Sequence, residues 1–301
     1  MINICTHSDI NYLYKGLALY HSLEETIKED FTLFYLCNDD ETFNALKKLN
    51  KPNIKIFKLS FLESIESLLL RAKRQKKCMY ARSQHEQYMW CLTPYFVNYI
   101  LHYFIEDNDT LVYADADIYF YESVQLILDT VKDKSIGVHT HKFSGEFKDD
   151  IATGWYNVGV VTFKRDVIGL KASNYWKDLV LYPDNEHYEK YGTCGDQKYL
   201  ELIVEKHKDV VCIFDETSNI GHLAAWCSSP LALNPDNKKI IYKGNVQYLV
   251  FYHFSHFNCE ISTNSWRDHN NIDKPEWHPS SHPFIKDLYE NYFKVIKKIN
   301  L

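Results

Sequence analysis

Short apolar runs alternate with longer segments of helical periodicity through the first part of the chain. The runs at 2–6, 32–37 and 54–59 have the length of buried strands. Between the first two, apolar residues from Tyr12 to Leu23 recur at the three- and four-residue spacing of a helix. Strand, helix, strand repetition of this kind is typical of parallel strands with helices on the faces of the sheet.

The same pattern extends to the middle of the chain. Residues 61–105 have a helical pattern, and we expect a helix to start at Thr93-Pro94, because proline suits the first turn. No internal repeat or low-complexity linker marks a boundary, so we expect one α/β domain with a Rossmann-like, mostly parallel mixed sheet flanked by helices. Further strands are expected at 111–113, 136–139, 157–163, 210–214 and 248–254.

The last segment, 283–301, predicts an amphipathic helix with lysines near its end. We therefore expect a catalytic domain over 1–260 and a C-terminal appendage over 261–301. Two interpretations of this helix are open. Its apolar face packs on its own domain, or the helix rests on an anionic membrane surface. The lysines fit either interpretation, since they also complement the helix dipole.

Composition narrows the class of protein. A chain of 301 residues with 46% hydrophobic residues is able to bury a large core. The net charge of −6 and the lack of a long basic block argue against a nucleic-acid partner. The start of the chain lacks the features of a signal peptide, and no apolar run reaches the ~20 residues of a membrane span, so we expect a cytoplasmic protein. The aromatic content of 15% suits a groove that stacks sugar rings.

Candidate chemistry begins where the apolar run Leu111 to Tyr113 leads directly into Asp115-Ala116-Asp117. Ligands of parallel sheets bind at the carboxyl ends of the strands. Carboxylates at i and i+2 point to opposite faces within a strand, but at a strand end both are able to approach one ion. A hard divalent cation held there would stabilise the negative charge of a departing diphosphate. Asp-x-Asp alone is a weak signal, and the preceding buried strand strengthens it.

Four segments together resemble one enzyme family. They are Val-Tyr-Ala-Asp-Ala-Asp-Ile-Tyr-Phe, Tyr-Asn-Val-Gly at 156–159, Asp196-Gln197, and Tyr-His-Phe at 252–254. In order and rough spacing they resemble the retaining glycosyltransferase family of glycogenin and the bacterial lipooligosaccharide galactosyltransferases, which has the GT-A fold. The chain has a closer resemblance to uncharacterised bacterial glycosyltransferases that carry Thr-Pro after an aromatic run, Tyr-Asn-Val-Gly, Gly-Asp-Gln-Lys-Tyr-Leu and Tyr-His-Phe. The resemblance covers residues 1 to about 258 and implies a metal-dependent transferase of a nucleotide-diphosphate sugar, with a UDP-sugar as the expected donor.

The resemblance implies that Asp115, Asp117 and His253 bind the metal. Two carboxylates and an imidazole suit Mn²⁺ or Mg²⁺. His256 is an alternative ligand, because Tyr-His-Phe-Ser-His-Phe offers two imidazoles. An alternative interpretation is that His253 is a hydrogen-bonded histidine of the core, at a strand end, and binds no metal. The Gly-x-x-Lys-Pro-Trp stretch that follows in the family is absent here, which leaves part of the diphosphate contact unassigned.

The resemblance also assigns the donor sugar and the chemistry. Asn157 and Gly159 match residues at the donor sugar, although a strand-entering turn would equally explain the glycine. Asp196 and Gln197 match the catalytic pair, although Asp196 is also a candidate helix cap. Gln197 favours a retaining reaction, in which a polar group faces the sugar carbon. The nucleotide-sugar contacts implied by the family are Thr6, His7, Asp9, Tyr12, Asp115 and Ala116, and the candidate bases for an inverting reaction are Asp149, Asp150, Asp196 and Glu216.

We expect the donor site to lie mainly in residues 1–165 and the acceptor side mainly in residues 166–260. The expected acceptor is a glycan or a lipid-linked glycan, and a membrane-bound C-terminal helix would then hold the enzyme at the inner face of the membrane. Two rival classes stay open. A sugar nucleotidyltransferase should have a glycine-rich phosphate loop after the first strand, and Thr-His-Ser-Asp-Ile-Asn is not one. A carbohydrate- or nucleotide-binding module would keep the fold without turnover.

Overall fold

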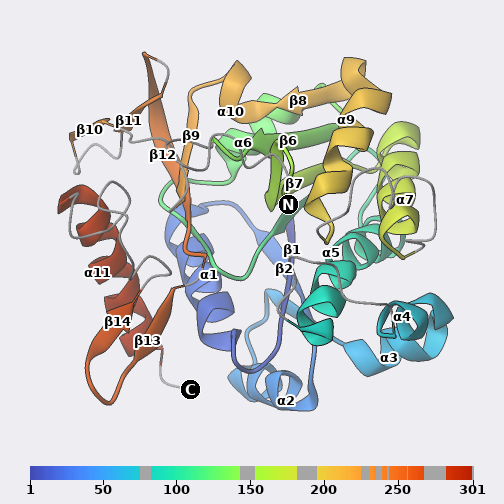
Figure 1. The fold of residues 1–301 in the computed structure, drawn as a ribbon, viewed down its shortest axis with the longest axis horizontal. Helices are drawn as coiled ribbons and strands as arrows, with labels where there is room; N and C mark the ends of the chain where they lie inside the picture. The colour runs from blue at the N-terminus through green and yellow to red at the C-terminus, as the bar shows by residue number, and fades with distance from the viewer. Residues whose placement is uncertain are drawn as a thin grey trace.

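The largest sheet of the computed structural model has seven strands and forms the centre of the molecule (Figure 1). Its order is β3-β2-β1-β4-β7-β6-β8, and β7 runs antiparallel to both of its neighbours while the other pairs are parallel. The predicted mostly parallel α/β sheet is therefore confirmed. The strands are β1 (Ile2–Ser8), β2 (Phe31–Cys37), β3 (Ile54–Lys58), β4 (Thr110–Ala114), β6 (Ile136–Thr140), β7 (Tyr156–Lys164) and β8 (Val211–Ile213). The structure describes residues 1–74, 83–142, 153–181, 195–224, 231–234, 239–242, 244–255, 257–267 and 283–299.

Helices cover both faces of this sheet, because its central strands are apolar on both sides. In β2, Phe34 and Leu36 belong to one core cluster and Leu33 and Tyr35 to another, as the period of two in a strand requires. The first face carries α3 (Leu59–Ile65), α4 (Ser67–Ala72), α5 (Gln84–Tyr103), α7 (Val167–Leu181) and α9 (Leu200–His207). The second carries α1 (Leu13–Thr26), α2 (Asp40–Leu49), α6 (Gln125–Val131) and α10 (Phe214–Thr217).

The expected helix start at Thr93-Pro94 is wrong. Helix α5 begins at Gln84, and the Ser83 side chain accepts a hydrogen bond of 3.0 Å from the Glu86 backbone N–H. Ser-x-x-Glu is the capping-box sequence, so the true start had its own signal. Pro94 lies inside the helix and is buried, and the packing of this buried face outweighs the one hydrogen bond that proline removes.

A second sheet stands beside the first and combines distant parts of the chain. It contains β5 (Ile118–Phe120), β9 (Ile220–Ala224), β10 (Leu231–Asn234), β11 (Lys239–Tyr242) and β12 (Asn245–His253). Strands β5 and β12 are antiparallel, and their register places Ile118 opposite His253. This pairing carries the end of β12 to the segment that follows β4. A hairpin of β13 (Asn258–Glu260) and β14 (Ser265–Arg267) follows.

The predicted C-terminal helix is α11 (Pro283–Lys298), which lies beside α1 and the second sheet (Figure 1). Its apolar face packs in an aromatic cluster in which the rings of Phe254 and Tyr292 stack with centroids 3.9 Å apart. Tyr289 also lies in this cluster and is buried. The interpretation in which this face packs on its own domain is the one that the structure supports, and no apolar face is left for a membrane surface among the described residues of α11.

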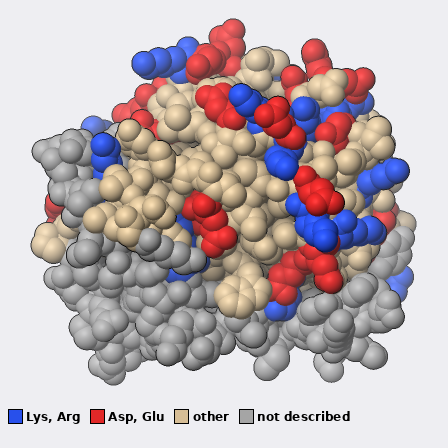
Figure 2. All heavy atoms as spheres, turned by 90° about the horizontal axis from the view of Figure 1, so that it is seen from above, with Lys and Arg blue, Asp and Glu red and all other residues tan. Residues whose placement is uncertain are grey.

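Among the described residues, none of the helices combines the length and the apolarity needed to cross a lipid bilayer. Acidic and basic side chains stand next to one another on the described part of the face shown in Figure 2. That part of the surface therefore presents a mixed charge distribution, in keeping with the modest net charge of −6.

Candidate active site

The turn between the two sheets positions the aspartate pair. Strand β4 ends at Ala114, and the Asp115 backbone N–H then donates to the Gly159 carbonyl at 2.9 Å. The Ile118 N–H donates to the Asp115 carbonyl at 3.0 Å, which closes a tight turn before β5. On the other side, the Phe254 N–H donates to the Asp117 carbonyl at 2.8 Å. One aspartate is thus fixed to the first sheet and the other to the second.

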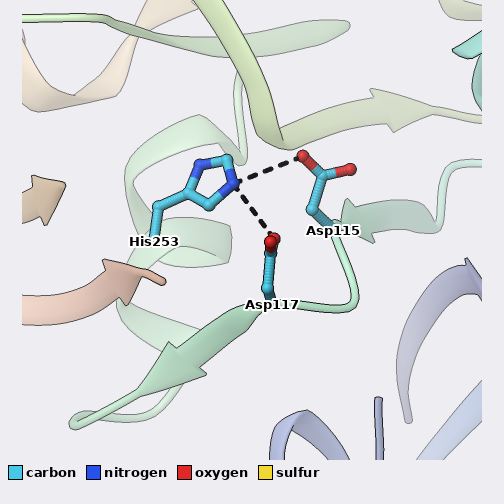
Figure 3. Close-up of side chains that lie close together, drawn as sticks. All are labelled: Asp115, Asp117 and His253. Carbon is cyan, nitrogen blue, oxygen red and sulfur yellow. Dashed lines mark ion pairs between the residues drawn. The ribbon is translucent and has the colours of Figure 1, made fainter. Parts of the chain in front are cut away.

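Asp115, Asp117 and His253 converge at this turn (Figure 3). The His253 Nε2 atom lies 3.0 Å from Asp117 Oδ1 and 3.7 Å from Asp115 Oδ2. One ligand atom from each residue lies within 4.8 Å of the other two. Asp117 and His253 are buried and Asp115 is partly exposed, so the cluster faces solvent on one side. Two carboxylates and one imidazole fit a divalent cation such as Mn²⁺ or Mg²⁺. His256, the alternative ligand, lies outside the described residues.

The electrostatics of the three residues are mutually dependent. Burial raises the pKa of Asp115, the nearby Asp117 charge raises it further, and His253 opposes both effects. Burial by itself would lower the pKa of His253, but the ion pairs with Asp117 and Asp115 outweigh it and raise that pKa above 6.5. A proton on His253 is thus stabilised by the same two carboxylates that would hold a cation, so proton and cation compete for one site.

The residues predicted at the donor sugar form one hydrogen-bonded group next to this cluster. The Gly159 N–H donates to Asn157 Oδ1 at 2.7 Å, and Asn157 Nδ2 lies 3.0 Å from His141 Nε2 and 3.3 Å from Gln197 Oε1. A Cβ on Gly159 would lie 2.6 Å from Asn157 Oδ1 and 2.7 Å from His253 Nδ1. Gly159 lies inside β7, so close approach of side chains, and not a turn before the strand, accounts for this glycine.

A buried polar network holds the end of β6 behind this group. Asp215 accepts hydrogen bonds from the Thr140 N–H at 3.1 Å and the Thr140 hydroxyl at 2.7 Å. Its Oδ2 atom also lies 3.1 Å from His222 Nε2 and 3.8 Å from Lys142 Nζ. Asp215 thus binds the backbone of Thr140 and the side chain of Lys142, the two residues next to His141 in the sequence. The imidazole of His141 is thereby held toward Asn157, with its pKa lowered to about 3, first by burial and then by His253.

Asp196 precedes a short 3₁₀ turn at Gln197–Tyr199, but its side chain makes no capping hydrogen bond there. Gly195 before it has φ +58°, in the left-handed region, which re-aims the chain at this point. The Trp176 ring N–H fixes the Asp196 backbone by donating to its carbonyl at 2.9 Å. Burial, followed by the Asp115 charge, raises the pKa of Asp196 to about 8. The Asp115 charge, the Thr93 side chain and the backbone of Asp196 and Gln197 all act on this carboxyl group, which makes no helix-capping hydrogen bond.

The predicted nucleotide contacts lie at the ends of β1 and α1. His7 Nε2 lies 3.0 Å from Thr93 Oγ1 and His7 Nδ1 lies 3.0 Å from Asn38 Nδ2, and burial lowers the pKa of His7 to about 4. Asp9 Oδ1 accepts a hydrogen bond of 3.1 Å from the Tyr12 N–H. The Tyr12 side chain is exposed at the start of α1, where a base could stack on it.

Thr6 differs from these residues, because it is fully buried within β1 and presents no surface to a ligand in this conformation. Ala116 is buried in the turn between the two aspartates. Of the other candidate bases for an inverting reaction, Glu216 is exposed on α10, and Asp149 and Asp150 lie outside the described residues.

Three residues that support the aspartates were missed by the sequence analysis. The Tyr113 hydroxyl donates to Asp115 Oδ1 at 2.7 Å. The Thr93 hydroxyl lies 3.2 Å from the Tyr113 hydroxyl. Lys15 places its Nζ 3.6 Å from Asp117 Oδ2. The one signal in the sequence was a lysine within an otherwise apolar helical pattern, between Leu13 and Leu17.

Fold and site together define a glycosyltransferase of the GT-A fold: a mixed sheet whose strand β4 ends in an aspartate pair that faces a histidine from a second sheet. Residues 3–213 match the model of Glycosyl transferase family 8, and the chain belongs to that family. The predicted enzyme class and the resemblance to the family of glycogenin and the lipooligosaccharide galactosyltransferases are thereby confirmed.

Known proteins are similar over most of the chain. The uncharacterized protein YfnF of Bacillus subtilis (strain 168) is 28% identical over 293 residues, which cover 95% of this chain and 89% of YfnF. The galactosyltransferase LgtC, solved in complex with donor and acceptor sugar analogs, aligns with a TM-score of 0.57 at 15% identity. The alignment covers 100% of this chain and 97% of the LgtC chain. Mouse xyloside xylosyltransferase 1 aligns with a TM-score of 0.55 at 13% identity, over 84% of this chain and 97% of its own. At these identities the two structures show the common fold.

Proposed function

We propose that this glycosyltransferase takes its sugar from a nucleotide-diphosphate sugar, a UDP-sugar in the first instance, and needs a divalent cation. The observation that carries the proposal is the convergence of Asp115, Asp117 and His253 at the strand end. A cation held there would supply Lewis-acid stabilisation of the charge on the departing diphosphate. His7, Asp9 and Tyr12 would bind the nucleotide, and Asn157 with Gly159 would position the sugar.

We further propose a retaining reaction on a glycan or lipid-linked glycan acceptor. The support is the placement of Gln197, whose side-chain oxygen lies 3.3 Å from Asn157 Nδ2 and thus within the predicted sugar site. Asp196 would act beside it, because an acid whose pKa is raised to about 8 is able to hold a proton at neutral pH. The donor would bind mainly to 1–165 and the acceptor mainly to 166–260, with 261–301 as the appendage.

The test is release of free nucleoside diphosphate from a panel of nucleotide sugars, with Mn²⁺, with Mg²⁺ and with a chelator. We expect cation-dependent release from one donor in the wild type and none in Asp117→Asn. Asp133→Asn changes an exposed aspartate in the turn after α6 and should be as active as the wild type. Equal activity of wild type and Asp117→Asn would overturn the site.

Other outcomes separate the rival classes. Ligand binding without release from any donor would identify a binding module, and synthesis of a sugar nucleotide with release of pyrophosphate would identify a nucleotidyltransferase. The stereochemistry needs its own measurement, the anomeric configuration of the first product by NMR. An inverted product would disprove the role given to Gln197.

A further inference from the structure

Trp155 exposes an aromatic side chain next to the predicted sugar site. It directly precedes β7 and is 57% exposed, whereas Trp176 is fully buried. Trp155 belongs to none of the three hydrophobic core clusters that the described residues form. An indole in this position leaves a large apolar surface in water, and tryptophan is enriched among the residues that dominate binding at protein interfaces.

The backbone of Trp155 is held from two sides. Its N–H donates to Glu201 Oε1 at 2.9 Å, and its carbonyl accepts from the His141 N–H at 3.0 Å. Lys198 Nζ donates to the same Glu201 oxygen at 3.0 Å, so Glu201 connects Trp155 to the turn that carries Gln197. The indole thus extends from a fixed backbone, and a ligand that binds to it has little backbone to order.

Trp155 adjoins Asn157 of the predicted sugar site. The pairing of β6 with β7, in which His139 lies opposite Asn157 and Thr140 opposite Tyr156, is continued by the hydrogen bond to the Trp155 carbonyl. Side chains two positions apart lie on the same face of a strand, about 7 Å from each other. Tyr156 between them packs against the core. A group bound on the indole would therefore be adjacent to a sugar bound at Asn157.

The order of the strands separates Trp155 from the predicted nucleotide site. Strand β4 lies between β1 and β7, and β7 is antiparallel to β4, so the ends of β1 and β4 and the start of β7 share one edge of the sheet. Tyr12 follows β1, the aspartate pair follows β4, and Trp155 precedes β7. In a transfer reaction the sugar lies between the departing diphosphate and the acceptor. A ligand on Trp155 would lie on the acceptor side.

We propose that Trp155 binds the acceptor, and that its indole stacks on a pyranose ring. The C–H groups on one face of a pyranose are apolar and suit the electron-rich face of an aromatic ring. This proposal rests on the proposed function, because it names the chemical class of the acceptor in that reaction. Trp155 is a binding residue in it and takes no part in the chemical step. A tryptophan that is only exposed would have no effect on the acceptor.

The test compares Trp155→Ala with Trp155→Phe, which keeps an aromatic ring. Nucleoside diphosphate release is measured with the donor found for the wild type, Mn²⁺, and methyl α- and β-pyranosides of glucose, galactose, mannose, N-acetylglucosamine and rhamnose as acceptor probes. For a pyranoside that stimulates release, we expect Trp155→Ala to raise its KM about tenfold or more, as for the loss of an aromatic binding residue. The kcat and the KM for the donor should change less than about threefold, as for an interaction made equally in the ground state and the transition state.

Trp155→Phe should keep most of the affinity for the pyranoside. Tyr103→Ala removes an aromatic side chain that is 73% exposed at the end of α5, and it should match the wild type. The hydrogen bonds of Trp155 come from its backbone, so the variants should fold, and thermal unfolding checks this.

Three results would overturn the proposal while the proposed function stands. They are a wild-type KM for the pyranoside in Trp155→Ala, a loss of kcat alone in that variant, and a wild type that releases nucleoside diphosphate from a donor but responds to no pyranoside. If the wild type releases nothing from any donor, with or without a pyranoside, the proposed function itself fails, and the acceptor role of Trp155 fails with it.

Discussion

Gly159 is the residue at which the predicted sugar site and the predicted metal site touch. Its N–H holds Asn157 by the hydrogen bond of 2.7 Å, and its carbonyl accepts from the Asp115 N–H at 2.9 Å. The space above its Cα is filled by Asn157 and the His253 ring. Because glycine has no side chain, the backbone of this one residue is able to hold Asn157 of the predicted sugar site and Asp115 of the predicted metal site.

Gly159→Ala should disturb both sites at once. The new methyl group would lie 2.6 Å from Asn157 Oδ1 and 2.7 Å from His253 Nδ1, and both side chains are buried, so the positions of these two side chains must change. We expect a loss of about 1–3 kcal/mol in the free energy of unfolding, as for overpacking. We also expect roughly tenfold weaker metal binding, as for a disturbed ligand support. Calorimetry with Mn²⁺ and urea unfolding measure the two effects, and unchanged Mn²⁺ affinity would contradict the crowding argument.

The sequence predicted those site residues whose chemistry is visible in a motif. Asp115 and Asp117 follow an apolar run, and His253 ends another, so the apolar pattern alone places these residues at strand ends. Lys15, Thr93 and Tyr113 were not predictable in this way. A lysine inside an apolar helical pattern is equally compatible with a side chain that extends to solvent, so the sequence does not determine whether it is buried. Tertiary packing decides its burial.

Among the elements, helix α11 has an indirect connection to the metal site. Tyr292 of α11 stacks on Phe254, with centroids 3.9 Å apart and planes within 2°. Phe254 follows His253 directly, and its N–H donates to the Asp117 carbonyl. The aromatic cluster under α11 thus supports the backbone that carries one metal ligand and holds another. We infer that the C-terminal helix contributes to the geometry of the site without contacting the ligand.

Tyr292→Ala tests this connection. Removal of a fully buried aromatic ring should cost about 3 kcal/mol or more in the free energy of unfolding. Because Phe254 loses its stacking partner, we also expect Mn²⁺ binding to weaken by a few-fold. Lys298→Ala changes an exposed residue of the same helix and should alter neither stability nor Mn²⁺ affinity by a measurable amount. A Tyr292→Ala protein with lower stability but unchanged Mn²⁺ affinity would show that α11 acts on folding alone.

At the scale of the whole molecule, the site exists because two sheets meet. The first sheet was predictable, since β1, β2, β3 and β4 are apolar runs separated by helices or long segments. The second was not, because β5 is three residues long and β10 and β11 four each, which is too short for a clear alternation. The antiparallel pairing of β5 with β12 is a contact between residues about 130 positions apart, which no local pattern encodes.

Stability of the whole molecule should report the competition between proton and cation at His253. The Asp117 and Asp115 charges raise the pKa of His253 above 6.5, so in the metal-free protein its ion pairs stabilise the fold below that pH. This stabilisation is lost as the pH rises through the raised pKa. Cation binding needs the neutral ring, so its apparent affinity should fall with decreasing pH by up to about tenfold per pH unit.

We therefore expect the increase in Tm caused by Mn²⁺ to be large at about pH 8 and to shrink toward about pH 6, because stabilisation by a ligand follows its apparent affinity. In His253→Gln, which has no proton to displace, the increase in Tm should be smaller at about pH 8 and should depend less on pH. Differential scanning fluorimetry of both proteins, with Mn²⁺ and with chelator, measures the four curves. An increase in Tm that does not change with pH in the wild type would show that His253 stays neutral in the metal-free site or does not bind the cation.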